Sequence, residues 1–245
     1  MYRDVLLVLH DIASNQVSAQ NVLDETMRVL VIERDKRKAS IERLLNDIKR
    51  STGTLPPSAE DTVTLIEQHL ACKKSSRLPV LVVAAAYQVA SQRLGERILR
   101  LHSHTAADEQ TGAAGDIEIT LLGDDSVVTT YEMKMKPVLI GDINIALKKI
   151  AAHKSIQHYI FITTHPVDAE VYEYAVRKYA ETGGVEIAIL DCVGFLRHFL
   201  HLFYRLRTDF LNAYQNFVLK EPDSAVSHAL KEAFLALRRT AEGAE

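Results

Sequence analysis

Cysteine is scarce in this 245-residue sequence, which contains only Cys72 and Cys192. Two cysteines cannot build a disulfide framework or a zinc cluster of several thiolates, and they fit a reducing compartment. Long apolar runs are also missing. Val5–Leu9 is too short for the core of a signal peptide, and Leu78–Ala90 is too short to span a bilayer and contains Gln88. We therefore expect a cytoplasmic protein with no membrane segment.

Several sequence motifs of common enzyme classes are absent. There is no phosphate-binding P-loop and no glycine-rich dinucleotide fingerprint. No G-x-S-x-G element is present, and Ser227-His228 forms no recognisable triad with an acid. The sequence therefore gives no indication of these enzyme classes.

Lysine and arginine are absent from Leu101 to Met133, a stretch that contains seven acids. These acids are Asp108, Glu109, Asp116, Glu118, Asp124, Asp125 and Glu132. The segments on either side are predominantly basic, although the whole chain has a net charge of −3. An acidic centre between basic flanks suits a metal site that lies against a polyanion, and scattered solvated charge is the alternative interpretation.

Apolar residues make up 47% of the chain, enough for one large domain or one domain with a smaller companion. Apolar residues recur at helical spacing over residues 1–72. Gly53 and Pro56-Pro57 interrupt this helical region. After them we expect a helix over 80–101, strands over 117–122 and 127–135, a helix over 143–152, a strand over 158–164, a helix over 169–181, a strand over 185–191, and helices over 193–217 and 224–239. Residues 123–126 carry a hairpin signal.

This order predicts an α/β fold with a mixed sheet covered by helices on both faces. Right-handed crossovers would place the strands over 158–164 and 185–191 beside the hairpin. We expect a helical N-terminal subdomain or arm over residues 1–74 and the main domain over residues 75–245.

Three residues of the hairpin carry the strongest chemical signal. Side chains alternate along a strand, so Glu132 and Lys134 share one face, and Asp116 opens the preceding strand. Two carboxylates that meet can hold a hard divalent cation, for which the carbonyl of Met133 is a further oxygen ligand. Lys134 would orient or deprotonate a metal-bound water and offset charge on the phosphate. The alternative is a polar strand face beside a turn, because E-x-K is common by chance.

Other residues are weaker candidates for this site. Glu118 lies two positions beyond Asp116 and therefore faces the same side, as a further ligand or a supporting acid. Glu96, on the expected preceding helix, is an accessory candidate that would act through water. A surface ion pair is its alternative role.

Four segments together resemble the SacI family of type II restriction endonucleases, over about residues 75–240. They are LHSHTAADEQTGAAGDIEI (101–119), YEMKMK (131–136), YIFITT (159–164) and AILDCVGFLRHFL (188–200). The resemblance implies a restriction-endonuclease-like fold of the PD-(D/E)xK type and Mg²⁺-dependent cleavage of double-stranded DNA at a short site. It assigns the catalytic roles to Asp116, Glu132 and Lys134. Gly115 stands where the family pattern has proline.

The resemblance also implies partners. Such an enzyme typically acts as a two-fold homodimer on a palindromic site. A cognate methyltransferase would protect host DNA, with no stable complex between the two proteins. Gln110, Lys136, Asn144 and His165 lie near expected strand ends and are the candidates for contacts to DNA.

Two other functions remain open. A repair, transposon or junction nuclease on the same fold differs in the shape of its substrate and not in its chemistry. A non-catalytic DNA-binding module would keep the fold without cleaving DNA.

Overall fold

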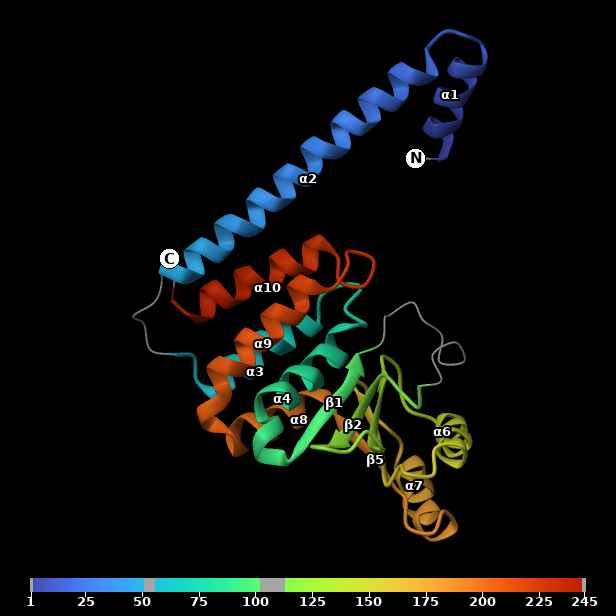
Figure 1. The fold of residues 1–245 in the computed structure, drawn as a ribbon, viewed down its shortest axis with the longest axis vertical. Coiled ribbons are helices and arrows are strands. Elements are labelled where there is room, and N and C mark those ends of the chain that lie inside the picture. Colours follow the sequence, from blue (N-terminus) through green and yellow to red (C-terminus); the bar gives the residue numbers. More distant parts are fainter. Residues whose placement is uncertain (1, 51–55, 102–112, 244–245) are drawn as a thin grey trace.

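The computed structural model describes residues 2–50, 56–101 and 113–243, and the structural statements below concern these residues. They form a five-stranded mixed sheet with helices on both faces and a helical N-terminal region (Figure 1). This confirms the predicted fold class. The helices are α1 (Tyr2–Ala13), α2 (Ala19–Arg50), α3 (Ala59–Leu70), α4 (Leu78–Leu94), α6 (Ile140–Ala152), α7 (Ala169–Glu181), α8 (Cys192–Leu202), α9 (Arg207–Lys220) and α10 (His228–Ala241), with a short 3-10 turn, η1 (Tyr204–Leu206).

The strands follow one another across the sheet in the order of the sequence, β1-β2-β3-β4-β5. They are β1 (Glu96–Leu101), β2 (Ile117–Leu121), β3 (Val127–Lys134), β4 (His158–Thr163) and β5 (Glu186–Asp191). The first three pair antiparallel, whereas β3, β4 and β5 are parallel and are joined through α6 and α7. The predicted hairpin and the two predicted crossover strands are confirmed.

The predicted helix over residues 80–101 is wrong in its second part. Helix α4 ends at Leu94 because Gly95 adopts a left-handed conformation with φ of 71°, which glycine tolerates and which cannot continue a helix. The chain then enters β1, which pairs antiparallel with β2. Glu96 is therefore the first residue of an edge strand and does not lie on a helix.

Each face of the sheet has its own hydrophobic core. Helices α3, α4, α8, α9 and α10 bury one core, to which β2 contributes Ile117 and Ile119 and β3 contributes Tyr131. Helices α6 and α7 cover the opposite face, where Tyr159 and Phe161 of β4 are buried (Figure 1). Because side chains alternate, Glu118 of β2 and the residues Thr130, Glu132 and Lys134 of β3 point toward the α6–α7 face.

The N-terminal helices are only partly attached to this body. The C-terminal part of α2 packs on α10, while α1 has no buried residue and lies at the far end of α2 (Figure 1). Helix α3 is buried in the same core as α4 and α10. The division of the chain at residues 74 and 75 remains a prediction. Within the described ranges, no helix is both long and apolar enough to cross a membrane.

The buried His69 provides a test of this packing. Its ring is fully buried, with Nδ1 3.0 Å from the Tyr214 hydroxyl and Nε2 3.0 Å from the Leu230 carbonyl oxygen. A carbonyl only accepts, so Nε2 carries the proton and Tyr214 donates to Nδ1. Burial lowers the pKa of His69 to about 4, although the bond to Leu230 opposes the shift.

We expect this histidine to destabilise the fold as pH falls. The folded pKa lies below the unfolded value, so the stability that neutral His69 contributes is complete above about pH 6.5 and is lost progressively toward pH 4. His69→Gln should therefore remove about 2 kcal/mol of the stability change between pH 7.5 and 5, measured by urea denaturation. The exposed His158→Gln variant is the control. Equal pH dependence in His69→Gln and the parent would contradict this account.

Candidate active site

The predicted acids meet where β2 begins and β3 ends. Ile117 pairs with Tyr131, so Asp116, one residue earlier, lies across from Glu132 on the α6–α7 face. The Asp116 carboxylate accepts a hydrogen bond of 2.7 Å from the backbone N–H of Met133. The sheet register therefore brings these two carboxylates to the same end of neighbouring strands.

Gly115 permits the close approach that places Asp116. A Cβ atom at this position would lie 2.6 Å from the Thr130 side chain and 2.7 Å from the Tyr131 carbonyl oxygen. The second of these atoms belongs to the backbone of β3 and cannot move aside. Any side chain at residue 115 would therefore push the Asp116 segment away from β3, which explains glycine at this position.

Lys134 is paired with two carboxylates. Its Nζ atom lies 2.6 Å from Glu132 and 3.2 Å from Asp142 of α6. The side chains of Glu132 and Lys134 are 13% and 17% exposed, so both charged groups are largely withdrawn from water. The predicted pair on one strand face is therefore a close, mostly buried ion pair.

Two further partners of Glu132 were missed from the sequence. Lys149 of α6 places its Nζ atom 3.0 Å from Glu132 Oε2, and the Tyr159 hydroxyl donates to the same oxygen. Asp142 and Lys149 are seven residues apart, a spacing that puts both on one face of a helix and could have drawn attention to them. Nothing in the sequence identified Tyr159, because its neighbours in β4 are mostly apolar and predict only a buried strand.

These contacts fix the charges of the site. Burial on its own raises the pKa of Glu132, but the hydrogen bonds from Lys134 and Tyr159 and the charge of Lys149 together lower it. Burial likewise favours a neutral Lys134, but Glu132 and then Asp142 raise the pKa of its ammonium group. Glu132 is therefore ionised and Lys134 protonated at neutral pH.

The oxygen atoms at this site suit a hard cation. Asp116 and Glu132 each provide a carboxylate, and the N–H and C=O of a strand residue point to the same side, so the Met133 carbonyl faces the Asp116 edge. In the described parts of the chain, no group of three or more His, Cys, Asp and Glu side chains is arranged to hold a metal ion. Mg²⁺ commonly uses only one or two carboxylates and takes its other ligands from water and phosphate. The donor set thus fits Mg²⁺.

The two accessory candidates lie in different places. Glu118 is buried on the same face as Asp116, and its Oε1 accepts a 2.8 Å hydrogen bond from the N–H of Ala114. It thereby holds the segment that leads into Asp116. Glu96 begins β1 and pairs with Leu121, at the opposite end of β2 from Asp116, so the structure does not bring it to the site.

The four predicted DNA contacts are also dispersed. Lys136 and His165 are exposed just beyond the paired ends of β3 and β4, and the Lys136 carbonyl accepts from the Thr163 hydroxyl. Asn144, on α6, accepts a 2.7 Å hydrogen bond from Tyr174 of α7. Gln110 lies outside the described residues.

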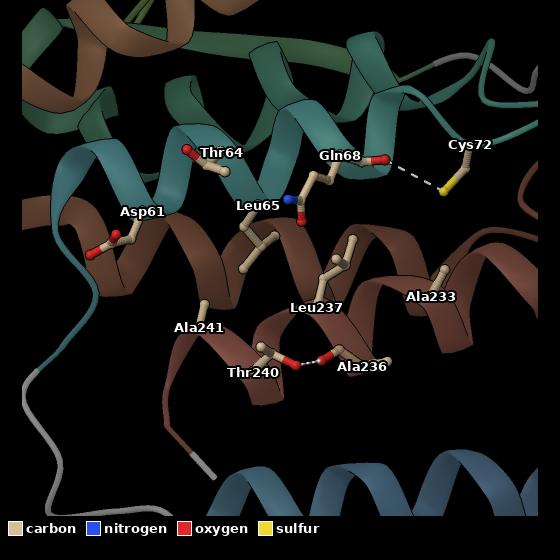
Figure 2. Close-up of a pocket in the computed structure, with 10 residues that line it drawn as sticks. All are labelled: Asp61, Thr64, Leu65, Gln68, Cys72, Ala233, Ala236, Leu237, Thr240 and Ala241. Atoms are coloured by element: carbon tan, nitrogen blue, oxygen red, sulfur yellow. Dashed lines mark hydrogen bonds between the residues drawn. The ribbon is translucent and has the colours of Figure 1, made fainter. Parts of the chain in front are cut away.

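A hollow of about 720 Å³ between α3 and α10 is separate from these residues (Figure 2). It is lined by Asp61, Thr64, Leu65, Gln68, Cys72, Ala233, Ala236, Leu237, Thr240 and Ala241. Asp61 is engaged in the capping box of α3 with Ser58. The Cys72 thiol donates to the Gln68 carbonyl of α3, and the Thr240 hydroxyl donates to the Ala236 carbonyl within α10. The hollow therefore lacks the paired carboxylates and amine of the strand site.

Comparison with known proteins gives a family match, which covers a little less than half of the chain. Residues 56–165 match the family model for the SacI restriction endonuclease C-terminal domain. The match confirms the predicted relationship to SacI-family restriction endonucleases, and it includes Asp116, Glu132, Lys134, Lys149 and Tyr159. No curated protein matches the chain. A restriction endonuclease domain is a nuclease domain, and its substrate is DNA.

Lys149 allows a matched test of the charge cluster. We expect Lys149→Met to raise the pKa of Glu132 and to lower the free energy of unfolding by about 1–2 kcal/mol at pH 7, because a buried carboxylate loses one charged partner. The pKa of Glu132 is lower in the folded protein than in the unfolded chain. Its ionised carboxylate therefore stabilises the fold at pH values above the unfolded pKa, and this stabilisation is lost as the pH falls through the folded pKa. Carboxyl NMR titration and urea denaturation measure the two effects.

The control is Lys148→Met, which removes an exposed lysine from the adjacent position of the same helix. Equal changes in both variants would show that Lys149 does not stabilise ionised Glu132.

Proposed function

We propose that this protein is a type II restriction endonuclease that hydrolyses double-stranded DNA at a short specific site in a Mg²⁺-dependent reaction. The observation that carries the proposal is the ion pair of 2.6 Å between Lys134 and Glu132, beside Asp116 on the neighbouring strand. The family match over residues 56–165 supports the nuclease class. Chemistry at a phosphodiester needs this combination of hard oxygen ligands and a nearby positive charge.

In this proposal Asp116, Glu132 and the Met133 carbonyl hold Mg²⁺. When bound, the ion would polarise the phosphate and lower the pKa of a water molecule. Lys134 is a cation at neutral pH because its two carboxylate partners raise its pKa. In this state its role is to orient the attacking water and to stabilise negative charge on the phosphate.

Other residues position these groups. Tyr159 and Lys149 hold the same oxygen of Glu132, which restricts rotation of its carboxylate. Glu118, through the Ala114 N–H, supports the segment that carries Asp116. Reacting groups that are held in place before the substrate arrives need less reorganisation during the reaction.

DNA would approach the edge of the sheet where β3 and β4 end. Lys136 and His165 are exposed at this edge, close to Lys134, and are our preferred contacts to the duplex. Asn144 and Gln110 stay predicted contacts. We also propose that the enzyme acts as a homodimer in the cytoplasm, next to a cognate methyltransferase with which it forms no stable complex.

Three substitutions test the proposed roles. Asp116→Asn, Glu132→Gln and Lys134→Met should each lower the rate of Mg²⁺-dependent cleavage of linear plasmid DNA by a factor of about 10² or more. Binding to the same DNA with Ca²⁺ in place of Mg²⁺ should change much less, because phosphate contacts elsewhere remain. The exposed Lys154→Met variant is the control and should cut like the parent.

The products distinguish the alternatives. Discrete fragments from linear DNA support restriction, whereas cleavage confined to branched DNA supports a junction or repair nuclease. DNA binding without any Mg²⁺-dependent cleavage would indicate a non-catalytic module. If Lys134→Met cut as fast as the parent, the role given to this lysine would be wrong.

A further inference from the structure

An arm over residues 2–38, formed by α1 and the first 20 residues of α2, extends from the body (Figure 1). Many of its apolar side chains are exposed. Every residue of Val5–Leu9 in α1 is at least 43% exposed. In α2, Leu23, Met27 and Leu30 are 55%, 54% and 59% exposed. Their spacing of four and three residues places these three side chains on one face of the helix.

The exposed face of α2 continues a face that is already used for packing. The same alternating spacing leads along the helix to Ile41, Leu44 and Ile48, which contact the core that contains α10. Positions 34 and 37, between the two parts, are arginines. Among the described residues, the outer part of this stripe has no comparable cover, since its side chains remain about half exposed.

The size of the exposed surface suits a specific protein contact. The largest apolar patch on a typical monomer is about 300–600 Å². Exposed apolar residues lie along both helices of the arm, at Val5–Leu9 in α1 and at Leu23, Met27 and Leu30 in α2. A standard interface takes roughly 800 Å² from each partner, so a stable dimer would have to cover apolar side chains of α1 as well as the stripe of α2.

Charge along α2 selects the kind of partner. Asp24 and Glu25 make its second turn acidic, whereas Lys36, Arg37 and Lys38 make the end of the arm basic. Two such helices side by side in parallel would place like charges together. In an antiparallel pair, the acidic start of each helix lies on the side of the basic segment of the other, which is favourable.

We propose that the arm is an interface for a second copy of this chain. The two α2 helices run antiparallel about a two-fold axis between Met27 and Leu30, so that the exposed stripes cover each other. A two-fold interface uses the same patch on both subunits and needs a self-complementary surface, which the charge polarity of α2 provides. The exposed ion pairs within the helix, such as Arg28–Glu25, contribute little and do not oppose this arrangement.

The first experiment removes the apolar stripe. The triple variant Leu23→Glu, Met27→Glu and Leu30→Glu should weaken dimerisation of the full chain at least 100-fold in sedimentation equilibrium without DNA. Its body should keep the unfolding transition of the parent, because these residues lie outside both cores. The matched control places glutamate at Tyr172, Val176 and Tyr179, the exposed apolar stripe of α7.

Three results would overturn the proposal. The parent chain could be monomeric, the arm variant could stay dimeric, or the dimer could dissociate in the α7 variant and not in the arm variant. A monomeric parent whose arm binds lipid vesicles would instead assign the surface to membranes. This inference rests on the homodimer of the proposed function, but none of these results depends on nuclease activity, so the cleavage test can succeed or fail independently of this one.

The second experiment tests the antiparallel direction by exchanging charges. Asp24→Lys with Glu25→Lys should weaken the dimer about 10-fold at low salt, since both ends of α2 become basic. Adding Lys36→Glu and Lys38→Glu to the same chain reverses the polarity of the helix and should restore the parent affinity. Failure of the fourfold variant to recover, with helix content unchanged by circular dichroism, would rule out antiparallel pairing.

Discussion

The site depends on one carboxylate that is largely withdrawn from water. An ionised Glu132 is tolerated in the sheet only because ammonium groups from β3 and α6 and a hydroxyl from β4 surround it. Those partners come from three elements, so the charge of Glu132 fixes the position of α6 against the sheet as well as the protonation of Lys134. The same contacts that stabilise this part of the fold prepare its positive charge for a phosphate.

The second requirement is the register between β2 and β3. Asp116 precedes the first paired residue of β2, and it reaches Glu132 only if the chain can pass very close to the backbone of β3. Gly115 makes that passage possible, and the N–H of Met133 then binds the Asp116 carboxylate. A shift of one residue would turn Asp116 to the opposite face, toward the apolar core of α4 and α8.

Local patterns were enough to predict part of this arrangement. Strand alternation put Glu132 and Lys134 on one face, and the hairpin signal at Gly123 set β2 beside β3. The strand β1 was missed because its apolar residues continue those of α4, and only the conformation of Gly95 separates them. Lys149 and Tyr159 reach Glu132 through the packing of α6 and the parallel pairing of β4, which are long-range events that spacing alone does not specify. The roles of the site residues and the two-part division of the chain remain predictions.

The arm gives the chain an unusual relation to its solvent. Two interactions would act between paired α2 helices. Burial of the apolar stripe does not depend on the direction in which the helices run. The attraction between their acidic and basic segments does depend on it. Sodium chloride screens the second without removing the first, and kosmotropic salts such as sulfate strengthen the first. If α2 pairs as proposed, rising ionic strength would weaken the directed antiparallel pairing and leave the undirected apolar contact, so that the salt in the buffer would affect the solubility of the protein.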